Sequence, residues 1–382
     1  MSRVRFALLA LLVVLWVASP VTADDNTSKP TVTGQDWPVY RGNAASTGLA
    51  EGPLPAELEI LWEHRVEKGA FEATPVIAGG IVYIGDLDGT FFALDLMTGK
   101  PAWQKKFDTG FVAAAAVREN RVYVGDFDGR MHCLDAGDGE EQWTHETAGE
   151  ISSGPNFHKE NVLFGSQDST LYCLNAETGQ VAWKYSIDDQ IRCTPTIVSD
   201  HAFVAGCDGE LHIIDVSRGT EAGSVNISAP TGVTPAAVGD HVFFGTEGSQ
   251  FFCIDWKKAE VAWTFEDPRS SQPMRGDPAV SRNGVAFGGR SKKIYCLDRK
   301  TGRLNWQFAT RRRVDSAPII VDNRLYAAAA DGRLYVLDLT TGREIWQIEM
   351  GGGFTGSPAV SNQRLVIASD TGMVYCFGKE AN

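Results

Sequence analysis

The sequence lacks the compact motifs that identify many enzyme classes. No Gly-x-Ser-x-Gly elbow, P-loop or glycine-rich dinucleotide fingerprint occurs in its 382 residues. Its 7 histidines are scattered, and no pair has the spacing of a zinc site. Asp86-x-Asp88-Gly and Asp126-x-Asp128-Gly lack the later glutamate of a calcium loop, so we expect turns there. We therefore predict no catalytic residue and no metal ligand from these motifs.

Basic residues are also scarce relative to acidic ones. The chain has 35 Lys and Arg against 48 Asp and Glu, for a formal net charge of −13. Because duplex binding depends on cations that neutralise phosphates, nucleic acid is not an expected partner. We interpret the acidity as a contribution to solubility.

Long hydrophobic runs are missing as well. The apolar stretch 6–17 has 12 residues, whereas a membrane helix needs about 20. Arg3 and Arg5 precede this stretch and Val21-Thr22-Ala23 follows it, which predicts a signal peptide over residues 1–23. No cysteine occurs before Cys133, so we expect a periplasmic or secreted protein without an N-terminal lipid or a transmembrane anchor.

What the sequence does contain is a tryptophan that returns about every 40 residues. Its members are Trp62, Trp103, Trp143, Trp183, Trp263, Trp306 and Trp346, at intervals of 41, 40, 40, 80, 43 and 40. Gly223 stands at the vacant place within the interval of 80. A proline that opens an apolar segment keeps the same period, at Pro75, Pro155, Pro195, Pro235, Pro278, Pro318 and Pro358, with Ala115 in the missing place. A fixed period of this length indicates a repeat architecture.

Each repeat is predicted to contain four short strands. In the unit before Trp103, apolar residues fill 75–77, 81–84 and 91–94, and Gly/Asp-rich turns separate them. Proline is tolerated at the first residue of such a strand. Four strands in about 40 residues are typical of a β-propeller blade.

The two ends of the chain complement each other. The last unit, 358–377, has three strands and no tryptophan, whereas Trp62 lies in a strand with no blade before it. We therefore predict an all-β, eight-bladed propeller with four-stranded antiparallel blades, whose last blade is completed by the N-terminal strand. The predicted organisation is a signal peptide at 1–23, an N-terminal strap or linker at 24–57, the propeller at 58–378 and a tail at 379–382.

The cysteines follow the repeat rather than a disulfide framework. Cys133, Cys173, Cys253, Cys296 and Cys376 hold the same strand position in different blades. Disulfide Cα atoms must lie within about 7 Å, so these five are expected to be buried and unpaired. Cys193 and Cys207 flank the hairpin around Ser199-Asp200 and form the one candidate disulfide.

The unit Ala93-x-Asp95-x-x-Thr98-Gly99-Lys100-x-x-Trp103 resembles the tryptophan-docking motif of pyrroloquinoline quinone (PQQ) type propellers. That family includes quinoprotein alcohol dehydrogenases and the outer-membrane assembly protein BamB. The resemblance extends over residues 58–378 and implies a blade-docking role for the seven periodic tryptophans. Trp37-Pro38-x-Tyr40-Arg41-Gly42 is similar to segments that precede such propellers, and we interpret it as a strap on the ring.

The resemblance implies two functions of different classes. The dehydrogenases hold PQQ on the propeller axis with calcium, an aspartate base, a tryptophan floor and adjacent cysteines. This chain has no adjacent cysteine pair and is much shorter, so we do not expect that catalysis; PQQ and calcium are cofactor candidates by resemblance only. Its size favours a BamB-like monomeric scaffold that binds another envelope or secreted protein. A PQQ- or small-ligand-binding protein, including a quinoprotein oxidoreductase, is the alternative, and a purely structural propeller is a third interpretation.

Candidate binding residues come from the repeat register. Three residues before each strand-opening position lie Glu72, Val112, Ser152, Arg192, Gly232, Arg275, Asp315 and Thr355. We predict that they ring the axial mouth, with Glu72, Arg192, Arg275 and Asp315 as ligand contacts. The alternative is that these charges form salt bridges across a solvated pore.

A second candidate surface is cationic. Arg311, Arg312 and Arg313 form a basic run, and Arg269 lies in the long loop that precedes the neighbouring blade. Together these four arginines are predicted to form a patch for an anion or an acidic partner. The alternative is a solvated loop whose charges balance nearby acids.

Overall fold

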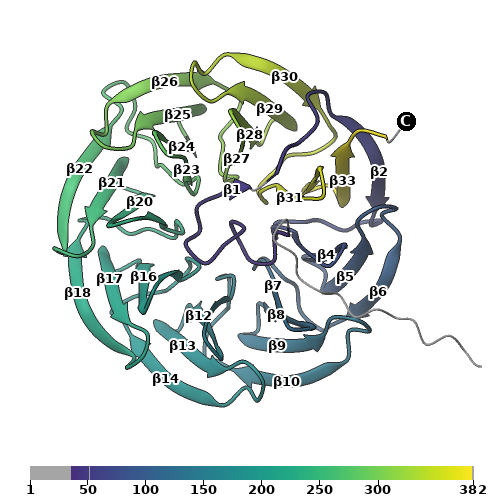
Figure 1. Ribbon diagram of the computed structural model, residues 1–382. Helices are drawn as coiled ribbons and strands as arrows, with labels where there is room; N and C mark the ends of the chain where they lie inside the picture. The colour runs from purple at the N-terminus through teal and green to yellow at the C-terminus, as the bar shows by residue number, and fades with distance from the viewer. Residues whose placement is uncertain (1–35, 51, 381–382) are drawn as a thin grey trace, which may run out of the picture.

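The structure is a computed structural model that describes residues 36–50 and 52–380. The predicted signal peptide at 1–23, residues 24–35 and 51 of the predicted strap or linker, and the last two residues of the predicted tail lie outside the described residues. Within the described ranges every regular element is a strand, and no helix of the length and hydropathy needed to cross a membrane is found. The strands form eight blades in a closed ring around a central axis (Figure 1).

The blades are numbered in chain order from β3. Blade 1 contains β3 (Val76–Ala78), β4 (Ile81–Gly85), β5 (Thr90–Asp95) and β6 (Pro101–Lys106); blade 2 contains β7 (Ala116–Arg118), β8 (Arg121–Gly125), β9 (Arg130–Asp135) and β10 (Glu141–Glu146). Blade 3 contains β11 (Asn156–His158), β12 (Asn161–Ser166), β13 (Thr170–Asn175) and β14 (Val181–Ser186); blade 4 contains β15 (Thr196–Val198), β16 (His201–Ala205), β17 (Glu210–Asp215) and β18 (Thr220–Asn226).

The second half of the ring repeats this pattern. Blade 5 contains β19 (Ala236–Val238), β20 (His241–Gly245), β21 (Gln250–Asp255) and β22 (Glu260–Glu266); blade 6 contains β23 (Ala279–Val280), β24 (Gly284–Gly289), β25 (Lys293–Asp298) and β26 (Leu304–Ala309). Blade 7 contains β27 (Ile319–Val321), β28 (Arg324–Ala328), β29 (Arg333–Asp338) and β30 (Glu344–Glu349); blade 8 contains β31 (Ala359–Ser361), β32 (Arg364–Ala368) and β33 (Met373–Gly378), with β2 (Glu59–Arg65) as its outer strand.

The N-terminal strand closes the ring as predicted. β2 pairs antiparallel with β33, and Trp62 lies opposite Cys376. Residues from the two ends of the propeller therefore share one sheet, and β33 does not remain an exposed edge strand. The predicted eight-bladed architecture with its last blade completed from the N-terminus is confirmed.

The core lies between neighbouring blades rather than at one centre. Tyr83 and Phe91 of blade 1 pack in one buried cluster with Val117 and Leu134 of blade 2. The third strand of a blade is almost wholly buried, whereas the outermost strand exposes alternate residues to solvent. Each blade thus buries its faces against its two neighbours, as expected for a repeat fold.

Six of the seven periodic tryptophans join their blade to the next. Trp62 Nε1 donates a hydrogen bond to the Leu96 carbonyl at 2.9 Å, and equivalent bonds start from Trp103, Trp143, Trp183, Trp263 and Trp306. Gly99 lies under the Trp62 ring with φ 69°, and a Cβ there would come within 2.5 Å of the ring. A glycine is therefore required by both the backbone conformation and the close approach.

Blade 4 lacks the periodic tryptophan, and a tryptophan of the neighbouring blade packs there instead. In blades 1, 2 and 5 the tryptophan ring packs on an aromatic of the second strand, as Trp143 does on Tyr123 with ring centroids 5.8 Å apart. In blade 4, where Gly223 replaces it, Phe203 instead packs on Trp256 of blade 5 at 5.4 Å. Trp256 Nε1 donates to the Gly239 carbonyl at 3.0 Å. A tryptophan thus still covers this aromatic, but from the adjacent blade.

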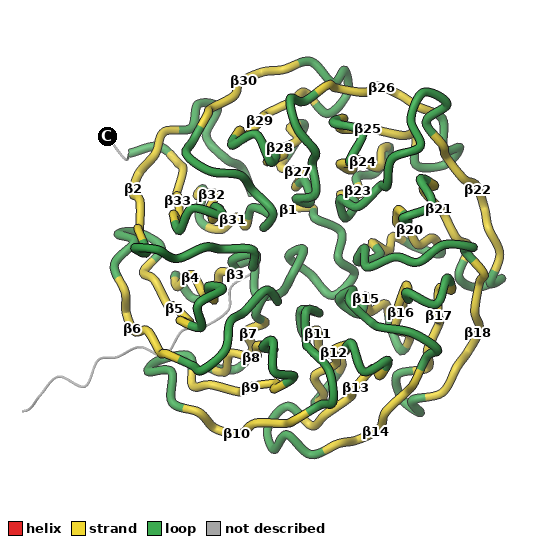
Figure 2. Tube along the Cα trace, turned by 180° about the vertical axis from the view of Figure 1, so that it is seen from behind, coloured by secondary structure: helices red, strands yellow, loops and turns green. Residues whose placement is uncertain are grey.

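Residues 36–50, the described part of the predicted strap up to β1, wind across the centre of the ring along the innermost strands (Figures 1 and 2). Backbone N–H groups of the innermost strands donate to strap carbonyls at distances of 2.7–2.9 Å, in the pairs Ile77–Trp37, Val117–Pro38, Ile197–Ala44, Ala237–Ala45, Val280–Thr47 and Ile320–Gly48. The strap ends in β1 (Leu49–Ala50), which pairs parallel with β27. The inner strand of each of these blades would otherwise leave an unpaired edge donor, so the strap satisfies backbone groups around most of the ring.

Candidate functional site

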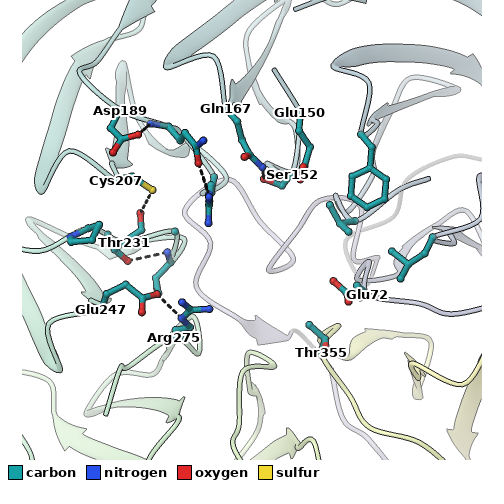
Figure 3. Close-up of a pocket in the computed structure, with 18 residues that line it drawn as sticks. Glu72, Glu150, Ser152, Gln167, Asp189, Cys207, Thr231, Glu247, Arg275 and Thr355 are labelled. Atoms are coloured by element: carbon teal, nitrogen blue, oxygen red, sulfur yellow. Dashed lines mark hydrogen bonds and ion pairs between the residues drawn. The ribbon is translucent and has the colours of Figure 1, made fainter. Parts of the chain in front are cut away.

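A cavity of about 850 Å³ opens on the axis at one end of the ring (Figure 3). Seven of the eight residues predicted to ring the axial mouth line it: Glu72, Val112, Ser152, Arg192, Gly232, Arg275 and Thr355. Three of the four predicted ligand contacts, Glu72, Arg192 and Arg275, are therefore brought together around one cavity.

Alternation along the chain aims these residues at the axis. Phe71 and Ala73 are buried, whereas Glu72 between them is exposed to the cavity. Ile191 and Cys193 enclose Arg192 in the same way. Because successive side chains of an extended segment point to opposite sides, the buried neighbours fix the ring residue toward the axis.

Asp315 is the exception among the predicted contacts. It is not among the residues that line the cavity, and it pairs with Arg313 at 2.8 Å and with Arg290 at 3.3 Å. Two arginines from its own side of the ring therefore compete for the carboxylate. This position follows the alternative interpretation, in which rim charges form salt bridges.

Arg192 and Arg275 differ in their partners. Arg275 Nε lies 2.5 Å from Glu247 Oε1 in an ion pair. Arg192 donates from Nε and Nη2 to Gln190 Oε1 at 3.0 and 2.6 Å and forms no ion pair with a described residue. Gly232 is the next ring position, where a Cβ would lie 3.2 Å from Arg192 Cβ. The Arg192 stem thus lies against a glycine, and a neutral amide orients its guanidinium.

The sequence pattern predicted only one of the four carboxylates that line the cavity. Glu150, Asp189 and Glu247 line the cavity together with Glu72. Burial raises the pKa of Glu150, the positive charge of Arg192 opposes this, and the negative charge of Glu72 adds to it. Of the carboxylates missed by the sequence analysis, Glu247 had a signal. Residues at intervals of 40, in the turn after the second strand of successive blades, line the cavity: Leu87, Phe127, Gln167, Cys207 and Glu247.

The inner end of the cavity is formed by the strap and blade 6. A deeper pocket of about 150 Å³ is lined by Tyr40, Asp277 and ring residues that include Thr194 and Thr234. Tyr40 donates to Asp277 Oδ2 at 2.6 Å, and the Thr234 N–H donates to Oδ1 at 3.0 Å. Burial raises the pKa of Asp277, which the charge of Arg41 and these hydrogen bonds oppose. Burial and the Asp277 charge raise the pKa of Tyr40 well above its usual value.

A belt of hydrogen bonds joins neighbouring blades at this depth. A backbone N–H of one blade donates to a side-chain oxygen of the next in the pairs Gly154–Thr194, Thr194–Thr234, Thr234–Asp277, Ala317–Ser357 and Ser357–Thr74, all at 2.9–3.0 Å. Ala114, at the same position in blade 2, has no side-chain oxygen to continue it. The belt holds the rim residues, which lie two positions earlier, in a fixed circle.

The four arginines of the second candidate surface do not share one site in the structure. Arg269 lines a separate cavity formed by residues 248–249 and 266–271. Arg313 is bound to Asp315, and the Arg311 N–H donates to Asp331. Arg311, Arg312 and Arg313 are exposed, and their binding of an acidic partner stays a prediction.

All seven cysteines are free thiols in the structure, so the candidate bond between Cys193 and Cys207 is not formed there. Cys193 is buried, which raises its pKa to about 12, whereas Cys207 lines the axial cavity. The five cysteines at equivalent strand positions are buried.

The cavity lining does not match the groups that PQQ and calcium require by resemblance. Among the described residues that line it there is no tryptophan or asparagine, and Cys207 is the single cysteine. No group of three or more His, Cys, Asp or Glu side chains in the described ranges is placed to hold a metal ion. The arrangement instead offers fixed charges, hydroxyls and amides around a solvated cup, which suits binding.

Comparison with known proteins identifies relatives of two kinds. The sequence matches the profile of the family described as outer membrane protein assembly factor BamB over residues 56–265, 266–347 and 330–382. BamB of Aliivibrio fischeri is 32% identical over 93 residues, which span 21% of this chain and only 24% of that relative.

Solved structures of both kinds share the fold. BamB from Moraxella catarrhalis superimposes with a TM-score of 0.73 at 17% identity, over 85% of this chain and 99% of that one. The quinohemoprotein alcohol dehydrogenase from Comamonas testosteroni superimposes with a TM-score of 0.76 at 14% identity, over 91% of this chain and 81% of that one. At these identities the likenesses show the fold alone.

Proposed function

The chain belongs to the family of the outer membrane protein assembly factor BamB, and we propose that it is an exported scaffold that binds another protein of the cell envelope. The axial cavity is the observation that carries this proposal. Its rim gathers side chains from seven of the eight blades, and these side chains vary from blade to blade although the strands behind them repeat. Repeat folds place their binding residues on such variable rims.

A periplasmic or secreted location is part of the same proposal. The predicted signal peptide and the family membership both support it, and the acidic surface suits a soluble exported protein. The partner is expected to be another envelope or secreted protein, bound by a monomer of this chain.

Site-specific photo-crosslinking in cells tests the proposal. p-Benzoylphenylalanine replaces Thr355, an exposed rim residue whose side chain forms no hydrogen bond with a described residue, and replaces Glu344 on the outer strand β30 as the matched control. We expect an adduct with another envelope protein from position 355 and none from position 344. No adduct at the rim, or equal adducts at both positions, would contradict the proposal.

A small-ligand role is the second candidate, because the cavity has a volume typical of ligand sites and holds an arginine without an ion-pair partner. Calorimetric titration with PQQ, with and without calcium, tests its best-defined form. Saturable binding of PQQ that is lost in an Arg192→Ala, Arg275→Ala double variant would support the small-ligand role. The absence of heat and of any shift in melting temperature would exclude PQQ as the ligand.

A further inference from the structure

The strap lies behind the axial cavity, and this limits what can occupy it. Tyr40 and Asp277 line the inner pocket, and the strap crosses the centre of the ring (Figures 1 and 2). A chain that enters from the mouth therefore meets the strap at the inner end of the cavity. The volume of about 850 Å³ accommodates a few residues. A chain end fits this shape better than a continuous strand.

The Arg192 guanidinium is held in place and keeps N–H donors for an anionic group. Gln190 holds Nε and one hydrogen of Nη2, which leaves Nη1 and the second Nη2 hydrogen without a described acceptor. The stem rests on Gly232, where any larger residue would displace it. A planar guanidinium whose geometry is fixed in advance binds a carboxylate through two parallel hydrogen bonds at reduced entropic cost. The end of a chain that carries a carboxylate is its C-terminus.

Carboxylates that could accept a cationic group lie on another side of the cavity. Glu72 and Glu150 line the cavity from the segments that lead into blades 1 and 3, separate from each other, and both lie away from the Arg275–Glu247 ion pair (Figure 3). Neither Glu72 nor Glu150 forms an ion pair with a described residue. A cationic side chain near the bound carboxylate would neutralise them, and lysine or arginine has the length to reach across.

We propose that the axial cavity binds the C-terminus of a polypeptide that ends in lysine or arginine, with its carboxylate on Arg192 and its side-chain cation between Glu72 and Glu150. This rests on the proposed function, because it names the part of a partner protein that the rim would receive. The proposed ligand is the end of a chain. A free basic amino acid carries the same two charges and is the competing ligand.

Peptide titration of the mature protein tests the proposal. The probes are the acetylated peptide Ala-Ala-Ala-Lys with a free carboxylate, the same peptide amidated, acetylated Ala-Ala-Ala-Ala with a free carboxylate, and free lysine. We expect saturable binding of the first peptide in calorimetry. Amidation should weaken it about tenfold or more, because a charge-assisted hydrogen bond is lost. The alanine-ended peptide and free lysine should also bind more weakly.

Three variants assign the contacts. Arg192→Ala and Gly232→Val should both abolish the difference between the free and the amidated peptide. Glu72→Gln should instead reduce the preference for lysine over alanine. Arg218→Ala removes one exposed arginine on an outer turn, outside the cavity, and should change nothing. Unchanged melting temperatures would show that each variant is folded.

Three outcomes would overturn the proposal. They are equal affinity for the amidated peptide, equal or tighter binding of free lysine, and no binding of any probe at millimolar concentration. A failure here leaves the crosslinking result untouched, since an adduct at position 355 requires only that some partner reaches the rim. The two proposals therefore fail separately.

Discussion

The Tyr40 hydroxyl donates a hydrogen bond to Asp277 Oδ2 at 2.6 Å, although the two residues are 237 positions apart in sequence. One belongs to the strap and the other to the segment that leads into blade 6. Asp277 is 8% exposed and accepts its other bond from the Thr234 N–H of blade 5. A single carboxylate thus connects the strap to two blades at the inner end of the axial cavity.

Removing the Tyr40 hydroxyl should destabilise the protein. Tyr40→Phe leaves Asp277 Oδ2 buried without its donor, which costs about 1–3 kcal/mol. Chemical denaturation at neutral pH, compared with wild type, measures this change in the free energy of unfolding. Tyr185→Phe is the control, because its hydroxyl bonds the exposed Glu221 on an outer strand. An equal loss in both variants would refute a special role for the strap contact.

The raised pKa of Asp277 predicts how stability depends on pH. Because burial raises the pKa in the folded state above that in the unfolded state, the folded chain favours the protonated acid. The resulting stabilisation is present at low pH and is lost as pH rises through the raised pKa. Asp277→Asn removes this titration, so wild type should lose stability relative to the variant over that range. Thermal melts across the acidic to neutral range measure it, and parallel pH profiles would contradict it.

The hydrogen-bond belt should be worth measurable stability at each junction. Thr194→Val removes the acceptor for the Gly154 N–H and keeps the side-chain shape, so we expect a loss of about 1–2 kcal/mol. Thr220→Val on the exposed outer strand β18 is the matched control and should change stability little. Urea titrations of both variants compare them. A Thr194 variant as stable as the control would mean that the belt contributes nothing.

Gly223 and Trp256 should behave as a coupled pair. Gly223→Trp alone should destabilise the protein, because Trp256 already covers Phe203. Trp256→Ala alone should cost about 2–3 kcal/mol, less than a fully buried tryptophan because Trp256 is partly exposed. The variant that combines Gly223→Trp, Trp256→Leu and Ala259→Gly restores the pattern of the other blades and should recover most of the stability. A combined variant that lost as much stability as the sum of the two single losses would exclude the coupling.

The repeat explains why so much of the fold could be predicted. Strands, turns and the tryptophan interval are set by residues close in sequence, and they recur in every unit. The strand register follows from the same period, and seven of the eight residues at the predicted rim positions line one cavity. Asp315 does not line it, and Arg290 and Arg313 pair with its carboxylate, which no spacing rule encodes.

The sequence by itself determined the number of blades, their strands and the completion of the last blade by the first strand. These follow from local periodicity and from the need to leave no open edge. Only the tertiary structure decided where the strap lies, that Tyr40 meets Asp277, and that Trp256 substitutes for the missing tryptophan. Such contacts join residues that become neighbours only once the ring has closed. Their geometry depends on the curvature of the whole ring, which no single repeat contains.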